Sequence, residues 1–147
     1  MNKESIYLIQ TDTTVGFLSS DDKKLNSIKH RPTSQKILQI VDSYKTLKEQ
    51  LRIPKKFRKL IRASKQTTFI YPNGNSYRVV DKKSSHHDFI KKFSILYSTS
   101  ANITKAKFDK TYAMKHCDVE VEDNCGFYES TPSKILKLYK TNIIKLR

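Results

Sequence analysis

At 147 residues the chain is long enough to bury a hydrophobic core, and we expect a single domain over residues 1–147. With 37% hydrophobic and 29% charged residues, its composition is neither that of a membrane-spanning chain nor that of a disordered one. The net charge of +15 favours polyanions such as nucleotide triphosphates or nucleic acid, although a general enrichment in Lys would produce the same excess. Without a bilayer-length apolar run or a signal-peptide pattern, we expect a cytoplasmic protein with no membrane partner.

The first apolar segment, residues 6–10, has the β-branched and aromatic content of a buried strand. A polar loop, residues 11–16, follows it. Ser20 can then cap a short helix that presents Leu25 and Ile28 to the core.

A pair of cations follows this helix. Pro32 disfavours helical backbone at Arg31, so we expect Arg31 to be extended. In an extended segment Lys29 and Arg31 share a face and point at one anion, whereas His30 points away.

The middle of the chain alternates strand and helix patterns. We expect a strand at residues 37–41, then a helix that begins at Asp42 or Ser43 and ends by Pro54. The next helix should bury Phe57, Leu60 and Ile61. Its outer face carries the densest basic run in the chain, which is either a solvated helix face or an RNA-contacting surface: Lys55, Lys56, Arg58, Lys59 and Arg62.

Several strands are expected in the second half of the chain. Asn73-Gly74 predicts a hairpin between residues 67–71 and 76–80, and Ser84 or Ser85 should cap the following helix. Residues 93–97 predict a buried strand that delivers an uncharged polar tip, Ser98 to Asn102. Further strands are expected at residues 118–122, 135–138 and 143–147.

Three polar segments stand in the order of the motifs of a known family. They are Thr11-Asp12-Thr13-Thr14-Val15-Gly16-Phe17, Lys29-His30-Arg31-Pro32 and Ser98-Thr99-Ser100-Ala101-Asn102. They resemble the Thr-Asp/Glu-Thr-x-Tyr-Gly-Leu, Lys-x-Arg-Pro and Ser-Thr-Ser-Ala-Asn segments of the YrdC/Sua5 family, the threonylcarbamoyl-AMP synthases and their relatives. The resemblance implies an α/β fold, a YrdC-like twisted mixed β-sheet with helices packed on it and a basic concave site.

Other family positions are lost in this chain. Thr68 and Arg78 retain the threonine and arginine of two family segments whose prolines are absent. Ile103-Thr104 replaces a Ser-Gly pair, and Ser130-Thr131 resembles a closing Ser-Thr-x-x-Asp segment without its acid. The chain is also shorter than is usual for the family.

The resemblance implies a reaction of ATP, L-threonine and bicarbonate to threonylcarbamoyl-AMP and pyrophosphate, for the threonylcarbamoyladenosine modification of transfer RNA. ATP is then a substrate, Mg²⁺ accompanies it, and no protein-held metal and no catalytic base is assigned. Transfer RNA or double-stranded RNA and other proteins of the pathway are the implied partners. The residues implied for ATP are Lys29, Arg31, Thr68, Ser98, Ser100 and Asn102, and those implied for threonine and bicarbonate are Thr14, Arg78 and Ser130.

The alternative is a non-catalytic relative of the same fold that binds nucleotide or double-stranded RNA. The missing prolines, the missing glycine and the short chain favour it, whereas the intact cation pair and the Ser98 to Asn102 segment favour the enzyme. A zinc site is disfavoured, because the histidines and Cys117 and Cys125 lack ligand spacing. The two cysteines give no disulfide framework either.

Overall fold

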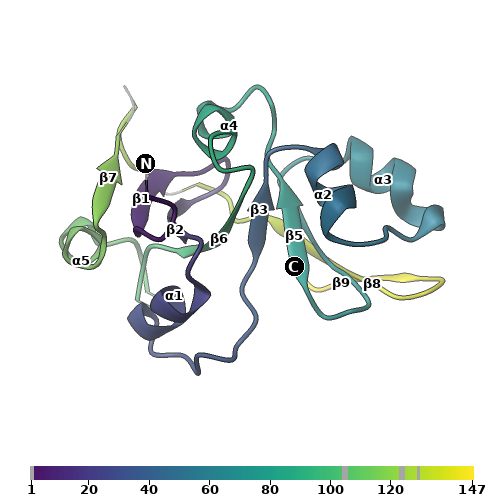
Figure 1. The fold of residues 1–147 in the computed structure, drawn as a ribbon, viewed down its shortest axis with the longest axis horizontal. Coiled ribbons are helices and arrows are strands. Elements are labelled where there is room, and N and C mark those ends of the chain that lie inside the picture. Colours follow the sequence, from purple (N-terminus) through teal and green to yellow (C-terminus); the bar gives the residue numbers. More distant parts are fainter. Residues whose placement is uncertain (1, 104–105, 123–124, 129) are drawn as a thin grey trace.

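The computed structural model describes residues 2–103, 106–122, 125–128 and 130–147. In these residues nine strands form one mixed sheet in the order β7-β1-β2-β6-β3-β5-β4-β8-β9, with helices packed on it (Figure 1). The strands are β1 Tyr7–Gln10, β2 Val15–Ser19, β3 Gln39–Val41, β4 Thr67–Ile70, β5 Ser76–Val79, β6 Ile95–Ser100, β7 Val119–Val121, β8 Lys134–Leu138 and β9 Ile143–Lys145. The helices are α1 Asp22–Ile28, α2 Tyr44–Gln50, the 3₁₀ turn η1 Lys55–Phe57, α3 Arg58–Ala63, α4 Ser85–Ile90 and α5 Lys110–His116.

The first strand is confirmed, but the loop expected after it is too long. β2 begins at Val15 and forms an antiparallel hairpin with β1, so the turn holds only residues 11–14. The hydroxyl of Thr11 donates to the Thr14 carbonyl and accepts from the Thr13 amide, which satisfies this tight turn locally. Gly16 lies close to β6, because a Cβ there would lie only 3.3 Å from the Thr99 carbonyl oxygen, a tight contact that a larger residue could make only if its neighbours shifted.

The side chains of β6 show which helices cover which face of the sheet. Ile95 packs on the core under α2 and α3, and Tyr97 on the core under α1 and α5. Leu96, between them, belongs to the core under α4. Because successive strand residues point to opposite faces, α4 covers one face and the other helices cover the opposite one.

Helix starts follow the expected capping chemistry with one shift. Ser43 and Ser84 cap α2 and α4 as predicted, whereas Asp21, not Ser20, caps α1 by accepting from the amides of residues 23 and 24. Leu60 was expected in the core and is 42% exposed. The preceding η1 turn winds more tightly than an α-helix, which rotates Leu60 off the buried face that Phe57 and Ile61 occupy.

The predicted hairpin is confirmed as β4 and β5, with Gly74 at a φ of 85° in its turn. β6 is longer than expected, because residues 98–100 pair with β2. The polar residues therefore lie within a strand, and only Ala101 and Asn102 follow it. Helix α5, capped by Asp109, has no counterpart among the expected elements.

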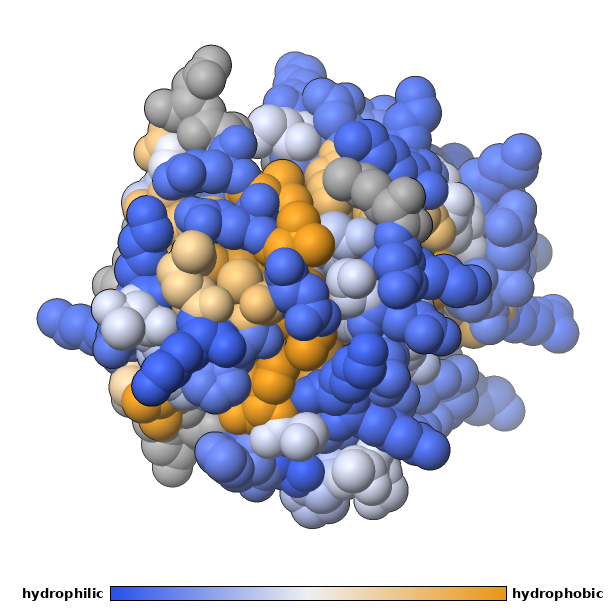
Figure 2. Space-filling model, turned by 60° about the vertical axis from the view of Figure 1, so that its left-hand side comes forward, coloured by the Kyte–Doolittle hydropathy of each residue, from blue (hydrophilic) through white to orange (hydrophobic). Residues whose placement is uncertain are grey.

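The surface is mostly polar around one apolar strip on the side of the molecule shown in Figure 2. None of the helices in the described part of the chain is long and apolar enough to span a membrane.

Candidate functional site

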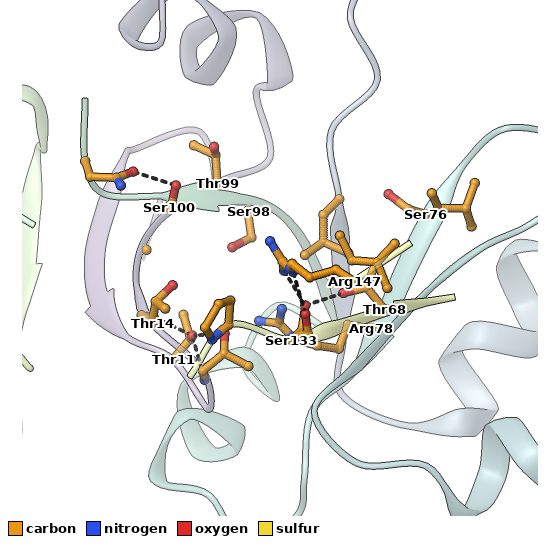
Figure 3. A pocket seen from close by; sticks show the side chains of 17 residues that line it. Thr11, Thr14, Thr68, Ser76, Arg78, Ser98, Thr99, Ser100, Ser133 and Arg147 are labelled. Atoms are coloured by element: carbon orange, nitrogen blue, oxygen red, sulfur yellow. Dashed lines mark hydrogen bonds between the residues drawn. The ribbon is translucent and has the colours of Figure 1, made fainter. Parts of the chain in front are cut away.

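A cavity of about 430 Å³ opens where the β1–β2 turn faces the ends of β4, β6 and β8 (Figure 3). Its volume lies in the range typical of small-molecule sites. The described residues that line it include no Asp or Glu. The polar lining residues labelled in Figure 3 are Thr11, Thr14, Thr68, Ser76, Arg78, Ser98, Thr99, Ser100, Ser133 and Arg147.

Arg78 is the most deeply buried cation of this cavity, with 4% of the residue exposed. A nitrogen of its guanidinium lies 3.3 Å from Oδ1 of Asp12, in the β1–β2 turn. Burial lowers the pKa of Arg78 and raises that of Asp12, and each charge opposes the shift of the other. Neither carboxylate oxygen of Asp12 nor Nε of Arg78 has a hydrogen-bond partner in the described part of the chain, so the pair is only partly satisfied.

Arg147 supplies a second guanidinium, which the sequence interpretation missed. It is held by Ser133, whose carbonyl accepts from Nε at 2.8 Å and whose hydroxyl lies 3.2 Å from a terminal nitrogen. The same hydroxyl lies 2.9 Å from that of Thr68, a predicted site residue. These contacts join β4, β8 and the chain after β9 in a polar wall with a positive charge.

Other predicted site residues line this main cavity, a smaller cavity that adjoins it, or both. Ser98 lines the main cavity, and its hydroxyl has no hydrogen bond among the described residues, which leaves it for a ligand. Thr14 and Ser130 both line a neighbouring cavity of about 160 Å³, and Phe108 lines it as well. Thr14, Ser100 and Asn102 line both cavities.

Asn102 is largely engaged in local contacts. Its amide oxygen accepts from the Ser100 hydroxyl at 2.6 Å and from the Lys29 ammonium at 3.0 Å, and its amide nitrogen donates to the Ala106 carbonyl. Lys29 also donates to the carbonyls of Ser100 and Asn102. Thr104 and Lys105, at the altered family position, lie outside the described residues.

The structure corrects the backbone expected for the cation pair. Lys29 is the C-cap of α1, and His30 has a φ of 54°, the left-handed conformation usually given to glycine. The His30 amide donates to Ser27 and the Arg31 amide to Asn26, a Schellman ending. The Lys29 ammonium therefore points toward the carboxyl end of β6. A terminal nitrogen of Arg31 lies 3.4 Å from the Thr99 hydroxyl oxygen. Neither cation lines either cavity, and their contact with ATP stays a prediction.

Lys29 has a structural role that can be measured. Replacing it with Met should lower the free energy of unfolding by about 1–3 kcal/mol, because buried carbonyl and amide acceptors lose their donor. Burial, with a smaller effect of Arg31, already lowers the pKa of Lys29 to about 8. Urea unfolding of the variant measures the loss. Lys23→Met, at an exposed position of the same helix, is the control, and equal stability of the two variants would refute this role.

The described residues contain no group of three or more His, Cys, Asp or Glu that could hold a metal ion. Asp12, in the β1–β2 turn beside the cavity, is paired with Arg78. These described residues therefore offer no carboxylate cluster of the kind that holds Mg²⁺, and the expected presence of Mg²⁺ stays a prediction.

No protein-family model matches the sequence, and no curated protein matches it. Solved structures do match the fold. A variant of Sua5 from P. abyssi superposes with a TM-score of 0.78 at 13% identity, over 98% of this chain and 52% of that one. P. abyssi Sua5 complexed with L-threonine gives a TM-score of 0.75 at 16% identity, over 98% of this chain and 50% of that one. YciO from E. coli superposes with a TM-score of 0.78 at 12% identity, over 99% of this chain and 83% of that one.

These matches define the fold class of the chain. It is an α/β protein with the YrdC/Sua5 fold, as the three motifs predicted. The chain spans about half the length of the Sua5 structures and most of YciO.

Proposed function

We propose that this chain makes threonylcarbamoyl-AMP and pyrophosphate from ATP, L-threonine and bicarbonate, as a nucleotidyltransferase that serves transfer RNA modification in the cytoplasm. The observation that carries the proposal is the pair of adjoining cavities. The larger one combines two guanidinium groups, Arg78 and Arg147, with hydroxyl groups and no lining carboxylate, which suits a phosphorylated ligand. The smaller one, with Thr14 and Ser130, suits the compact polar side chain of threonine.

The proposed chemistry needs positioning and charge neutralisation. The threonine amine and bicarbonate give a carbamate with loss of water, and the carbamate oxygen attacks the α-phosphate of ATP while pyrophosphate leaves. Both guanidinium groups would lower the cost of the charge on the phosphates. The hydroxyl of Ser98 would orient the nucleotide. Lys29 would reach the triphosphate only after its ammonium leaves Asn102.

The proposal predicts release of pyrophosphate that depends on threonine. Arg147→Gln should reduce turnover on the order of ten- to a hundredfold, the cost of one charge-assisted contact to phosphate. A coupled pyrophosphate assay with ATP, bicarbonate and L-threonine measures this, with the exposed Lys115→Gln as the control. Pyrophosphate release that is the same without threonine, or equal rates for the two variants, would contradict the proposal.

A second candidate is a nucleotide-binding relative without turnover. The contact between Lys29 and Asn102 favours it, because this contact keeps a cation of the Lys-x-Arg-Pro segment away from the cavity. It predicts ATP binding that Arg147→Gln weakens, together with no pyrophosphate release under any combination of substrates.

A further inference from the structure

A second, strongly basic cavity lies between α2 and the segment formed by η1 and α3. This α2–α3 cleft has a volume of about 520 Å³. Its lining includes the cations Lys48, Arg52, Arg58 and Arg62 and a single acid, Glu49.

The cleft is separate from the site described above. Tyr77 and Val79 of β5 pack in the core under α2 and α3, so Arg78 between them points to the opposite face of the sheet. The main cavity therefore opens on the face away from α2 and α3. No described residue lines both cavities.

Positive charge is concentrated around the cleft beyond what a general enrichment in Lys would give. Residues 44–62 contain eight Lys and Arg residues and one Glu, which accounts for seven of the fifteen excess positive charges of the chain. None of the eight forms an ion pair with a carboxylate of the described residues. Direct pairing with carboxylates therefore does not neutralise these charges within the described part of the chain.

Contacts within the protein hold several of these cations in place. The Tyr44 ring carries the Arg62 guanidinium at 4.8 Å and the Lys48 ammonium at 5.5 Å from its centroid. Arg58 Nε donates to the Ile53 carbonyl at 3.3 Å. The ammonium of Lys56 donates to the Thr141 carbonyl, which brings the β8–β9 turn to the edge of the basic surface.

The surroundings of the cleft favour a phosphate backbone over other anions. A membrane surface or a protein interface would bury apolar side chains, but Leu60 is the one exposed large hydrophobic residue in 44–62. A single strand of nucleic acid would stack its bases on open aromatic rings, and the Tyr44 ring is already covered by cations. Closely spaced cations without stacking surfaces match the regular charge of a duplex, and guanidinium groups match phosphate geometry.

We propose that the α2–α3 cleft and its basic rim bind the phosphate backbone of a nucleic-acid duplex without reading its sequence. The proposal is independent of the chemistry in the main cavity. It gives a location to the nucleic-acid affinity that the net charge suggests.

The test compares two triple variants with equal loss of charge. Arg52→Gln/Arg58→Gln/Arg62→Gln removes cations of the cleft, and Lys23→Gln/Lys91→Gln/Lys115→Gln removes exposed cations elsewhere. Binding to an RNA duplex of about 20 base pairs, and to a DNA duplex of the same sequence, is measured by fluorescence anisotropy over a range of salt concentrations. Circular dichroism and ATP binding of both variants check that the fold and the main cavity are intact.

The cleft variant should bind duplex on the order of tenfold more weakly, and its slope of log affinity against log salt should fall by about 2–3, one unit for each lost phosphate contact. The control should keep most of its slope. Comparison of the RNA and DNA arms identifies the duplex that is bound. Equal losses in the two variants would reduce the effect to bulk charge and overturn the proposal. Equal or tighter binding of poly-glutamate or anionic-lipid vesicles, lost in the same variant, would also overturn it.

Discussion

Replacing Arg78 with Met should lower the free energy of unfolding by about 3–5 kcal/mol near pH 7, because the variant leaves a buried carboxylate without its cation. The Asp12 side chain is 3% exposed and its oxygens have no hydrogen bond among the described residues. Its pKa is already raised by burial, and Arg78 is the main group that opposes this rise. Guanidinium denaturation of the variant measures the loss.

The pH dependence and a double variant separate the charge effect from the loss of packing. An acid whose pKa is raised in the folded state binds its proton more tightly there than in the unfolded state. Stability of Arg78→Met should therefore recover as the pH falls through the raised pKa of Asp12 toward 4. Asp12→Asn/Arg78→Met should recover much of the loss at pH 7. A double variant as unstable as Arg78→Met would show that the Asp12 charge is not the cause.

Acidification should destabilise the protein through His86. Its ring is buried under α4, 1% exposed, and neither ring nitrogen has a hydrogen-bond partner in the described part of the chain. Burial, followed by the charges of Arg78 and His87, lowers the pKa of His86 to about 3. In the unfolded chain His86 therefore binds a proton near pH 6.5, whereas in the folded chain it stays neutral down to about pH 3. The free energy of unfolding falls between these two pH values.

The free energy of unfolding should fall by about 2 kcal/mol between pH 7 and pH 5, because each pH unit between the folded and unfolded pKa values of His86 costs about 1.36 kcal/mol. His86→Phe should remove this part of the pH dependence. A small cavity of about 70 Å³ beside the ring gives room for the larger side chain. His30→Asn, at an exposed position whose φ of 54° Asn tolerates, is the control. Unfolding by urea at both pH values provides the measurement, and identical pH dependence in wild type and His86→Phe would exclude His86 as the cause.

Local signals in the sequence predicted most elements of the fold. Asn73-Gly74 defined the hairpin, and Ser43 and Ser84 marked helix starts, because turns and caps depend on residues close in sequence. The early start of β2 was missed, since the threonine run before Val15 resembles a loop. Helix α5 was also missed, although Asp109 is a typical N-cap residue and caps it in the structure.

The site was less accessible to prediction because its contacts are long-range. The three motifs predicted the fold and several of the residues that line the cavity, including Ser98. The contact of Lys29 with Asn102 joins residues 73 positions apart, and no local pattern indicates it. Likewise, nothing in the sequence around Arg147 shows that Ser133 turns its guanidinium into the cavity.

β3 has only three residues, yet the sheet passes through it from one half of the molecule to the other, with β6 on one side and β5 on the other. Ser98 lies on the β6 side of this seam, and Thr68 and Arg78 lie on the β5 side. The Asp12–Arg78 pair and the hydrogen bond from Gln66 to the Asp12 carbonyl tie the two halves together across the cavity. These two contacts, together with the pairing of β3 with both its neighbours, therefore hold the two sides of the cavity in place relative to each other.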